Sequence, residues 1–462
     1  MVKVTIFIAI LFFSISDFIN AQCPDGDLFI TTQAEMDMFI VQYPECKNLK
    51  HNVQIGLNLN SIDSTIIQNL FGLRNIELID GNLDIANATE LKNLEGLNSL
   101  KEIKGSLRIS DCPDLEELNG INVLTSIKGS FLFLRNLPSL NSLLPLSSLN
   151  EFSGHLSLNN LNKIENLKGL EFLVSINQLG VSNFSNLKTF EGLDNLVDVN
   201  ILSINFNDNI SIDGFPSLKS LGILQIAWNK NIQSIDFNAL EYVGERISFF
   251  ENENILIEGF SNLKIVEGAI DIDDNILIGL TGFSSLSKVG NIKVPNSIQG
   301  IEISGSIGLK EMTAFKNINY IHNLYIHNNP VLENILPFEN LDTINSLRVF
   351  KNEVLSNIDF LKFNDVFLGD VSIFNNEELD DITALWNSSK NISGILRIEE
   401  NPKLSTCTSV CYHLENNGAY DILDNEEGCN SKFEILDQCD LATSQVELSE
   451  NYEIQYFPNP GF

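Results

Sequence analysis

The side chains best suited to chemistry in this sequence include a group of carboxylates past its middle. Asp271, Asp273 and Asp274 stand within four residues of one another. Oxygen ligands at that density could hold a calcium ion, although no calcium-loop consensus surrounds them. The same carboxylates could act in acid–base catalysis if a cleft paired them with a base, and Lys293 is the basic residue nearby. The group is a candidate calcium site and the basis of an enzymatic alternative.

A second set of side chains recurs at regular intervals in the last third of the chain. Its aromatic and arginine residues follow one another in steps of about 24 residues. Exposed aromatic and arginine side chains are typical anchors of binding surfaces, but rows of them can also stabilise each other as cross-strand pairs. The candidate ligand-binding residues are Tyr325, His327, Arg348, Phe350, Phe374 and Arg397.

Other familiar catalytic patterns are missing from the sequence. Its five histidines show no metal-ligand spacing such as H-E-x-x-H. No phosphate-binding loop, dinucleotide-binding turn or nucleophile elbow is present. We therefore expect a protein that is not an enzyme, with no catalytic residue and no cofactor.

A repeated sequence motif runs through most of the chain, and the structure that it forms must position the candidate site residues. The unit reads G-x-L-x-I-x-x-N-x-x-L before a second apolar half, and clear copies begin at Gly81, Gly105 and Gly129. A fixed period of this length is the signature of a solenoid, in which stacked turns bury one continuous core. The alternation at L-x-I predicts one short strand per turn, and stacked strands form a parallel sheet. We expect a mainly β, right-handed solenoid of about 14–15 turns over residues 51–406.

A buried asparagine is expected where the chain leaves each strand. Asn stands seven positions after the glycine-like start in ten of fifteen repeats. Its amide can satisfy main-chain groups that lose their partners as the chain bends inward. Cys112 occupies the same slot and is expected to be an inert core thiol. The predicted ladder comprises Asn58, Asn136, Asn207, Asn229, Asn252, Asn275, Asn329, Asn352, Asn376 and Asn401.

The amino-terminal segment indicates export. Lys3, an apolar run over residues 4–13 and a small-residue site before Gln22 have the layout of a secretory signal peptide. Neither this run nor any later one has the roughly 20 apolar residues of a membrane span. Cys23, next to the expected cleavage site, raises a lipoprotein alternative, which the large polar Gln22 disfavours. We expect a secreted or cell-surface protein.

Six of the seven cysteines lie near the two ends of the chain. In an oxidising compartment, paired cysteines usually form disulfide bonds. Cys23 and Cys46 would close a loop around a short helix near Thr31 to Phe39. The other four allow three connectivities, with a zinc site as the alternative; they are Cys407, Cys411, Cys429 and Cys439.

The repeat resembles known families over about residues 23–440. Residues 105–115 and 394–404 look like the strand segments of leucine-rich repeats and, more closely, of the receptor L domain of insulin- and epidermal-growth-factor-type receptors. Residues 98–103 resemble the second half of that unit. The array is longer than one such domain, and no transmembrane segment or kinase follows. Growth-factor binding is therefore not carried over, and bacterial surface proteins with L-domain-like arrays are the nearer comparison.

The end of the chain carries a second resemblance. Residues 457–460, Phe-Pro-Asn-Pro, are similar to the opening of the sorting domain of type IX secretion substrates in Bacteroidetes. That domain continues well beyond this motif, so we expect a truncated chain whose full-length form uses the type IX machinery. The expected organisation is a signal peptide (1–21), an N-terminal cap (22–50), the solenoid (51–406), a Cys-rich C-terminal cap (407–440), and a linker with the start of the sorting domain (441–462).

The net charge of the chain excludes two classes of binding partner. The chain has 61 acidic and 28 basic residues, a formal charge of -33, and would repel nucleic acid and anionic lipid. We expect non-catalytic recognition or adhesion, in which the exposed sheet face binds an extracellular protein or glycan. The alternative is a β-helix polysaccharide-degrading enzyme, similar to lyases that carry Asp and basic residues on an exposed sheet face.

Overall fold

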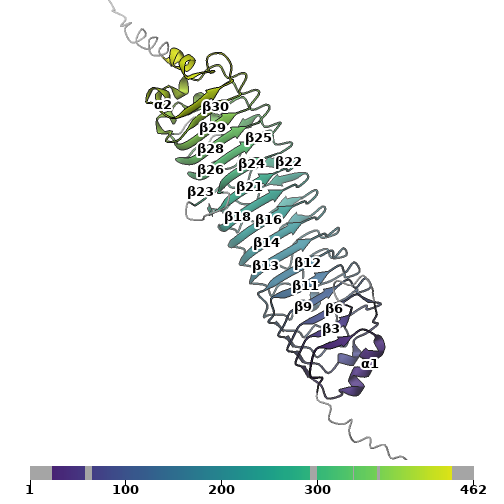
Figure 1. The fold of residues 1–462 in the computed structure, drawn as a ribbon. Coiled ribbons are helices and arrows are strands. Elements are labelled where there is room, and N and C mark those ends of the chain that lie inside the picture. Colours follow the sequence, from purple (N-terminus) through teal and green to yellow (C-terminus); the bar gives the residue numbers. More distant parts are fainter. Residues whose placement is uncertain (1–22, 58–64, 292–298, 337, 362–364, 440–462) are drawn as a thin grey trace, which may run out of the picture. The chain divides into compact units, whose positions relative to one another are not determined.

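The computed structural model describes residues 23–57, 65–291, 299–336, 338–361 and 365–439. The chain divides into two units, residues 1–154 and 155–462, and in each unit stacked turns contribute parallel strands (Figure 1). The repeat makes about 16 turns. The predicted mainly β solenoid is confirmed, while its right-handedness stays a prediction. The expected signal peptide, Asn58, Lys293 and residues 457–460 lie outside the described residues.

In the first unit, the L-x-I alternation forms short parallel strands. Leu83 pairs with Leu107 and Ile85 with Ile109, and these inward-facing side chains are buried. The main sheet contains β1 (Leu28–Ile30), β3 (Val53–Gly56), β6 (Leu83–Ala86), β9 (Leu107–Ser110) and β11 (Phe131–Arg135). Shorter parallel pairings join β2 (Asn48–Leu49), β5 (Leu78–Ile79), β8 (Glu102–Ile103) and β10 (Ser126–Ile127), and also β4 (Thr65–Ile66) and β7 (Ala88–Thr89).

The second unit continues the same pattern with longer strands, many of eight or nine residues. Its main sheet contains β12 (His155–Asn159), β13 (Ser175–Ser182), β14 (Asp198–Asn205), β16 (Ser220–Ala227), β18 (Tyr242–Phe250), β20 (Ile265–Val266), β21 (Ala269–Asp273), β23 (Lys288–Val289), β24 (Gly300–Ser304), β26 (Tyr320–His327), β28 (Thr343–Phe350), β29 (Phe367–Phe374), β30 (Leu396–Glu399) and β31 (Tyr420–Leu423). Shorter pairings join β15 (Ser211–Ile212) to β17 (Ser234–Ile235), and β19 (Ile255–Ile257), β22 (Leu277–Leu280), β25 (Glu311–Met312) and β27 (Asn334–Ile335) in series.

One residue with left-handed backbone geometry follows nearly every main-sheet strand, and we call it the corner residue. Its main-chain N–H donates to the last strand residue of the next turn, as Asn183 does to Asn205 at 3.2 Å. Most corners hold Asn or another polar residue, since few side chains tolerate positive φ well. The corners of the second unit are Asn160, Asn183, Phe206, Trp228, Glu251, Asp274, Gly305, Asn328, Lys351, Asn375, Glu400 and Asp424.

The residue after each corner occupies the ladder slot, and in most of the second unit it is a fully buried Asn. Asn229 shows the pattern: its Oδ1 accepts from the N–H and Nδ2 of Asn207, both at 3.0 Å. Its own Nδ2 donates to the carbonyl of Ile204 at 2.8 Å. The ladder runs from Asn207 to Asn275 and, beyond Ser306, from Asn329 onward.

The ladder prediction was wrong at Asn136, and it missed Asn425. Leu132 pairs with Leu107. The turn that begins at Gly129 therefore has one extra residue before its strand, and the later positions of that turn are shifted by one. Asn136 is therefore a corner residue with φ 51°, and the apolar Leu137 fills the slot. Asn425, in the predicted C-terminal cap, extends the ladder by accepting from Asn401 Nδ2 at 3.0 Å.

Inside the second unit, a column of phenylalanine rings packs from turn to turn. Neighbouring ring centroids lie between 4.8 and 6.3 Å apart, and pairs of this kind contribute about 0.5–1.5 kcal/mol each beyond burial. The column consists of Phe190, Phe215, Phe237, Phe260, Phe283, Phe315, Phe338 and Phe360.

Helices are short and lie mainly in the caps and at the backs of turns. Thr32 forms a capping box with Glu35 at the start of α1 (Gln33–Gln42), where a helix was predicted. Further helices are η2 (Phe71–Leu73), η3 (Leu144–Leu146), η4 (Asp359–Leu361), η5 (Thr383–Leu385), η6 (Ser389–Asn391), η7 (Thr408–Val410) and α2 (Cys411–Glu415), and residues 432–439 are also helical. Among the described helices, none has the length and apolar character needed to cross a membrane.

Three disulfides tie the caps. Cys23 bonds to Cys46, as expected. Of the alternatives for the rear cysteines, the structure has Cys407–Cys429 and Cys411–Cys439, so the zinc alternative is wrong. Cys112 is a free, buried thiol in the ladder slot.

Candidate functional site

Strand register brings most of the predicted ligand-binding residues together on the outward face of the second unit's sheet. Tyr325 pairs with Arg348, and His327 pairs with Phe350. Phe350 in turn pairs with Phe374. Because the strands are parallel and in register, residues one turn apart form straight rows across the face. We call His327, Phe350 and Phe374 the aromatic row.

The rings of the aromatic row stack on one another. His327 and Phe350 have centroids 4.4 Å apart and planes 9° apart, and Phe350 and Phe374 are separated by 4.5 Å and 7°. Both faces of the Phe350 ring are therefore covered by its neighbours. A ligand at the middle of the row meets ring edges, which carry partial positive charge and favour electronegative groups.

Arg348 gives the site a positive charge beside the aromatic row. Its guanidinium carbon lies 5.0 Å from the centroid of the Tyr325 ring, a cation–π contact that holds the side chain in place. The Arg348 side chain remains exposed. Within the described part of the chain, no carboxylate lies within ion-pairing distance of it, so its charge is available to a partner.

Arg397 is placed differently from Arg348. Its Nε lies 3.1 Å from Glu399 and 3.6 Å from Asp421. Two carboxylates thus neutralise it within the protein. Arg397 lies on the predicted surface, but it is a poorer anchor for an anionic group than Arg348.

At the other end of the row, His327 is held by an acidic neighbour. Its Nε2 lies 3.0 Å from Glu302 Oε1, and this hydrogen bond is the main reason that the pKa of Glu302 is lowered. The imidazole ring is therefore fixed in orientation and continues the Phe350 stack.

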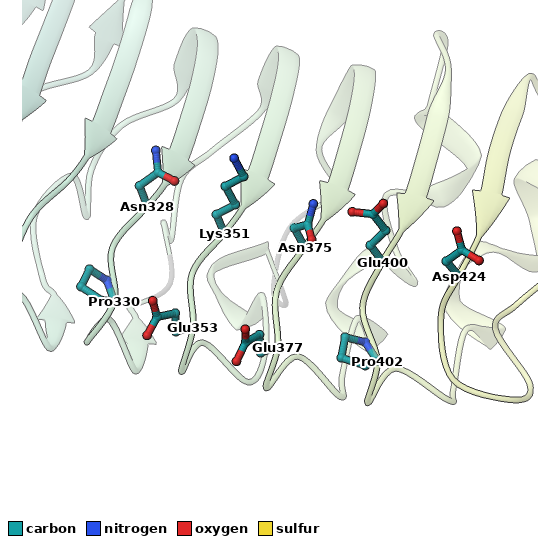
Figure 2. A pocket seen from close by; sticks show the side chains of 9 residues that line it. All are labelled: Asn328, Pro330, Lys351, Glu353, Asn375, Glu377, Glu400, Pro402 and Asp424. Atoms are coloured by element: carbon teal, nitrogen blue, oxygen red, sulfur yellow. The ribbon is translucent and has the colours of Figure 1, made fainter.

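An open groove of about 600 Å³ borders the aromatic row. Figure 2 shows its lining as two rows of side chains, one at the corners and one further along each turn. Each corner directly follows a residue of the sheet face, so the groove and the face are continuous. Four carboxylates and one lysine make the groove acidic; its lining is Asn328, Pro330, Lys351, Glu353, Asn375, Glu377, Glu400, Pro402 and Asp424. The groove was not predicted, although the polar residues at the corners were visible in the sequence.

The aspartate group does not assemble a metal site. Asp271 forms an ion pair with Arg246 at 2.9 Å, Asp273 accepts a hydrogen bond from Ser304, and Asp274 is a corner residue. No group of three or more His, Cys, Asp or Glu side chains among the described residues could hold a metal ion. The calcium hypothesis for these three aspartates therefore finds no support.

Asp271 nevertheless has an unusual environment. Its Oδ1 is buried and has no hydrogen-bond partner within the described residues. Burial, opposed by Arg246, raises the pKa of Asp271 to about 6. Asp271 is thus one carboxyl group with a raised pKa. Lys293, the base considered with it, lies outside the described residues.

A further aromatic group was not predicted. Phe206 and Trp228 occupy corners, and Phe250 ends β18 beside them. Their rings are in contact: the Phe206 and Trp228 centroids lie 4.8 Å apart, and those of Trp228 and Phe250 lie 5.3 Å apart. The position after each strand had no predicted role, so this group did not stand out in the sequence.

A family-model match agrees with the repeat architecture over part of the second unit and its border. The family model for the leucine-rich-repeat domain of the endo-β-N-acetylglucosaminidase EndoS matches residues 144–245. Among curated proteins, none matches the chain significantly. A solved structure with some similarity is the TLR13–ssRNA13 complex, at 15% identity and a TM-score of 0.34. That match covers 83% of this chain and 62% of the other, so this chain spans less than two thirds of that neighbour.

Proposed function

We propose that this protein is a non-catalytic recognition protein that binds an extracellular protein or glycan through the exposed sheet face of its second unit. The observation that carries the proposal is the exposed, unpaired charge of Arg348. It is exposed and unmatched by a carboxylate within the described residues, although the chain has a formal charge of -33. Arg348 also lies beside a row of stacked aromatic rings.

The strands that carry the site are held by neighbouring strands on both sides. Phe350 and Phe374 lie on strands paired on both sides, and the buried ladder Asn352 holds the turn beneath them through hydrogen bonds on both sides. A preorganised surface loses little conformational entropy on binding. Affinity at this surface can therefore come from few contacts, centred on Arg348.

Charge limits the class of partner. The acidic groove and the acidic chain disfavour nucleic acid and anionic membranes. Arg348 favours a carboxylate, sulfate or other electronegative group that reaches the aromatic row. Leucine-rich-repeat folds usually serve as interaction scaffolds, and the match of residues 144–245 to such a domain supports the same role.

We also propose that the protein acts outside the cell or at its surface. Three disulfides in the caps support an oxidising compartment. The resemblance of residues 457–460 to a sorting-domain opening supports export by type IX machinery.

The test is a binding screen of the purified protein against arrays of glycans and extracellular proteins, alongside a polysaccharide-cleavage assay. The proposal expects a partner whose binding is weakened by Arg348→Ala and Phe350→Ala. The matched control is Phe133→Ala, which removes an outward aromatic beside Arg108 in the first unit. Cleavage of a polysaccharide that is lost in Asp271→Ala would instead favour the enzymatic alternative.

A further inference from the structure

Phe206 and Trp228 are the two aromatic residues among the described corners of the second unit, where most turns have Asn or another polar residue. Their φ angles are 58° and 55°, a left-handed geometry that disfavours bulky side chains and suits Asn. The preceding corners, Asn160 and Asn183, do hold Asn. Strained residues of this kind are associated with functional sites. The conformation gives the turn no advantage, so the side chains themselves require an explanation.

The rings form a fixed platform. The planes of Phe206 and Trp228 are 3° from parallel, and Phe250 meets Trp228 edge-on at 89°. The indole Nε1 of Trp228 donates to Glu251 Oε2 at 3.0 Å, which fixes the ring's rotation. Ala227, an outward-facing residue paired with Phe250, is 0% exposed. Neighbouring side chains therefore cover the sheet face here.

The platform is open at one end. Phe206 is 50% exposed although Trp228 covers one of its ring faces, so the exposed area lies on the other face and the edge. That end is next to the turn whose corner is Asn183. This differs from the aromatic row, in which Phe350 is covered on both faces. An open aromatic face can receive the flat apolar face of another ring.

We infer that Phe206 and Trp228 form a second binding site, which takes a pyranose ring of a neutral glycan. The C–H face of a sugar ring fits an aromatic face, while its hydroxyls need polar partners at the rim. Glu251, Asn183 and Asp208 provide such partners around the platform. Glu253 and Asp208 make the surroundings acidic, with Lys230 lying 4.0 Å from Glu253, so an anionic sugar is disfavoured. This site shares no residue with the aromatic row and does not depend on the proposed function.

The test uses the full chain in affinity electrophoresis with soluble neutral β-glucan, xylan and α-mannan, and with anionic carboxymethyl cellulose. We expect at least one neutral polymer to retard the protein and the anionic polymer to have no effect. Phe206→Asn should weaken the retardation at least tenfold. This variant places at the corner the residue that its geometry prefers, so misfolding does not account for the loss. Phe133→Ala, which removes an outward aromatic of the first unit that belongs to neither site, should behave as wild type.

Tryptophan fluorescence locates the binding. The chain has two tryptophans, so Trp386→Phe leaves Trp228 as the sole emitter. A saturable change in emission with the retarding polymer is expected, and it should be lost when Phe206→Asn is added. The inference is overturned if no neutral polymer retards the protein, if Phe206→Asn binds as wild type, or if emission stays constant while the polymer binds. Retardation that Phe350→Ala abolishes and Phe206→Asn does not would assign the glycan to the sheet face instead.

Discussion

The side-chain amide of Asn229 donates to Oδ1 of Asn252 at 3.0 Å, and the main-chain N–H of Asn229 donates to the same oxygen at 3.1 Å. One buried oxygen therefore satisfies two donors of the preceding turn. Asn252 Nδ2 also donates to the carbonyl of Ile226 at 2.8 Å. These bonds tie neighbouring turns directly beneath the sheet edge.

Asn252→Ala should destabilise the protein by about 3 kcal/mol or more, because it leaves several buried polar groups unpaired. Asn183→Gly is the matched control. Asn183 is an exposed corner residue outside the ladder, and glycine suits its geometry, so the expected loss is below about 1 kcal/mol. Urea unfolding of the two variants measures the difference. Equal losses would show that the ladder does not hold the turns together.

The pH dependence of stability should report Asp271. The pKa of Asp271 in the folded protein, about 6, lies above its ordinary value of 3.8, so the folded state binds the proton more tightly than the unfolded state. The group therefore lowers stability as pH rises from about 4 to above about 6. Relative to Asp271→Asn, the wild type should lose on the order of 2 kcal/mol across that range. Parallel stability-versus-pH curves for the two proteins would refute this.

Cys112 should be unreactive in the folded protein. Burial raises the pKa of its thiol to about 12, and the thiolate is the nucleophile in alkylation. Iodoacetamide at pH 8 should modify no cysteine under native conditions. After denaturation without reductant it should modify one, because the other six form disulfides. Labelling of the native protein would show that the site opens.

Local patterns made much of this fold predictable. The L-x-I alternation defines which strand residues face inward, and the repeat period then places Tyr325 beside Arg348. The ladder followed from counting seven positions after each start, and it failed at Asn136 because one extra residue precedes Leu132. Asn425 stands seven positions after Gly418, but it was missed because the solenoid was predicted to end at residue 406 and this segment was assigned to the C-terminal cap.

Other parts of the site depend on three-dimensional information that spacing does not contain. The pairing of Cys407 with Cys429 requires knowing how the cap folds back. Neutralisation of Arg397 by Asp421 depends on β31, a strand in the segment that was predicted to be the Cys-rich cap. The corner role of Phe206 and Trp228 could be recognised only once the backbone angles were known.

The most direct test of the account is the affinity of the partner found in the screen for Arg348→Ala and for Phe133→Ala, measured by surface plasmon resonance. Arg348 contributes only an exposed cation–π contact to the fold, about 0.5–1 kcal/mol, so its removal should leave the structure intact. The account predicts at least a tenfold loss of affinity for Arg348→Ala and less than a twofold change for Phe133→Ala. Unchanged affinity in Arg348→Ala, or equal losses in both variants, would contradict recognition through this face.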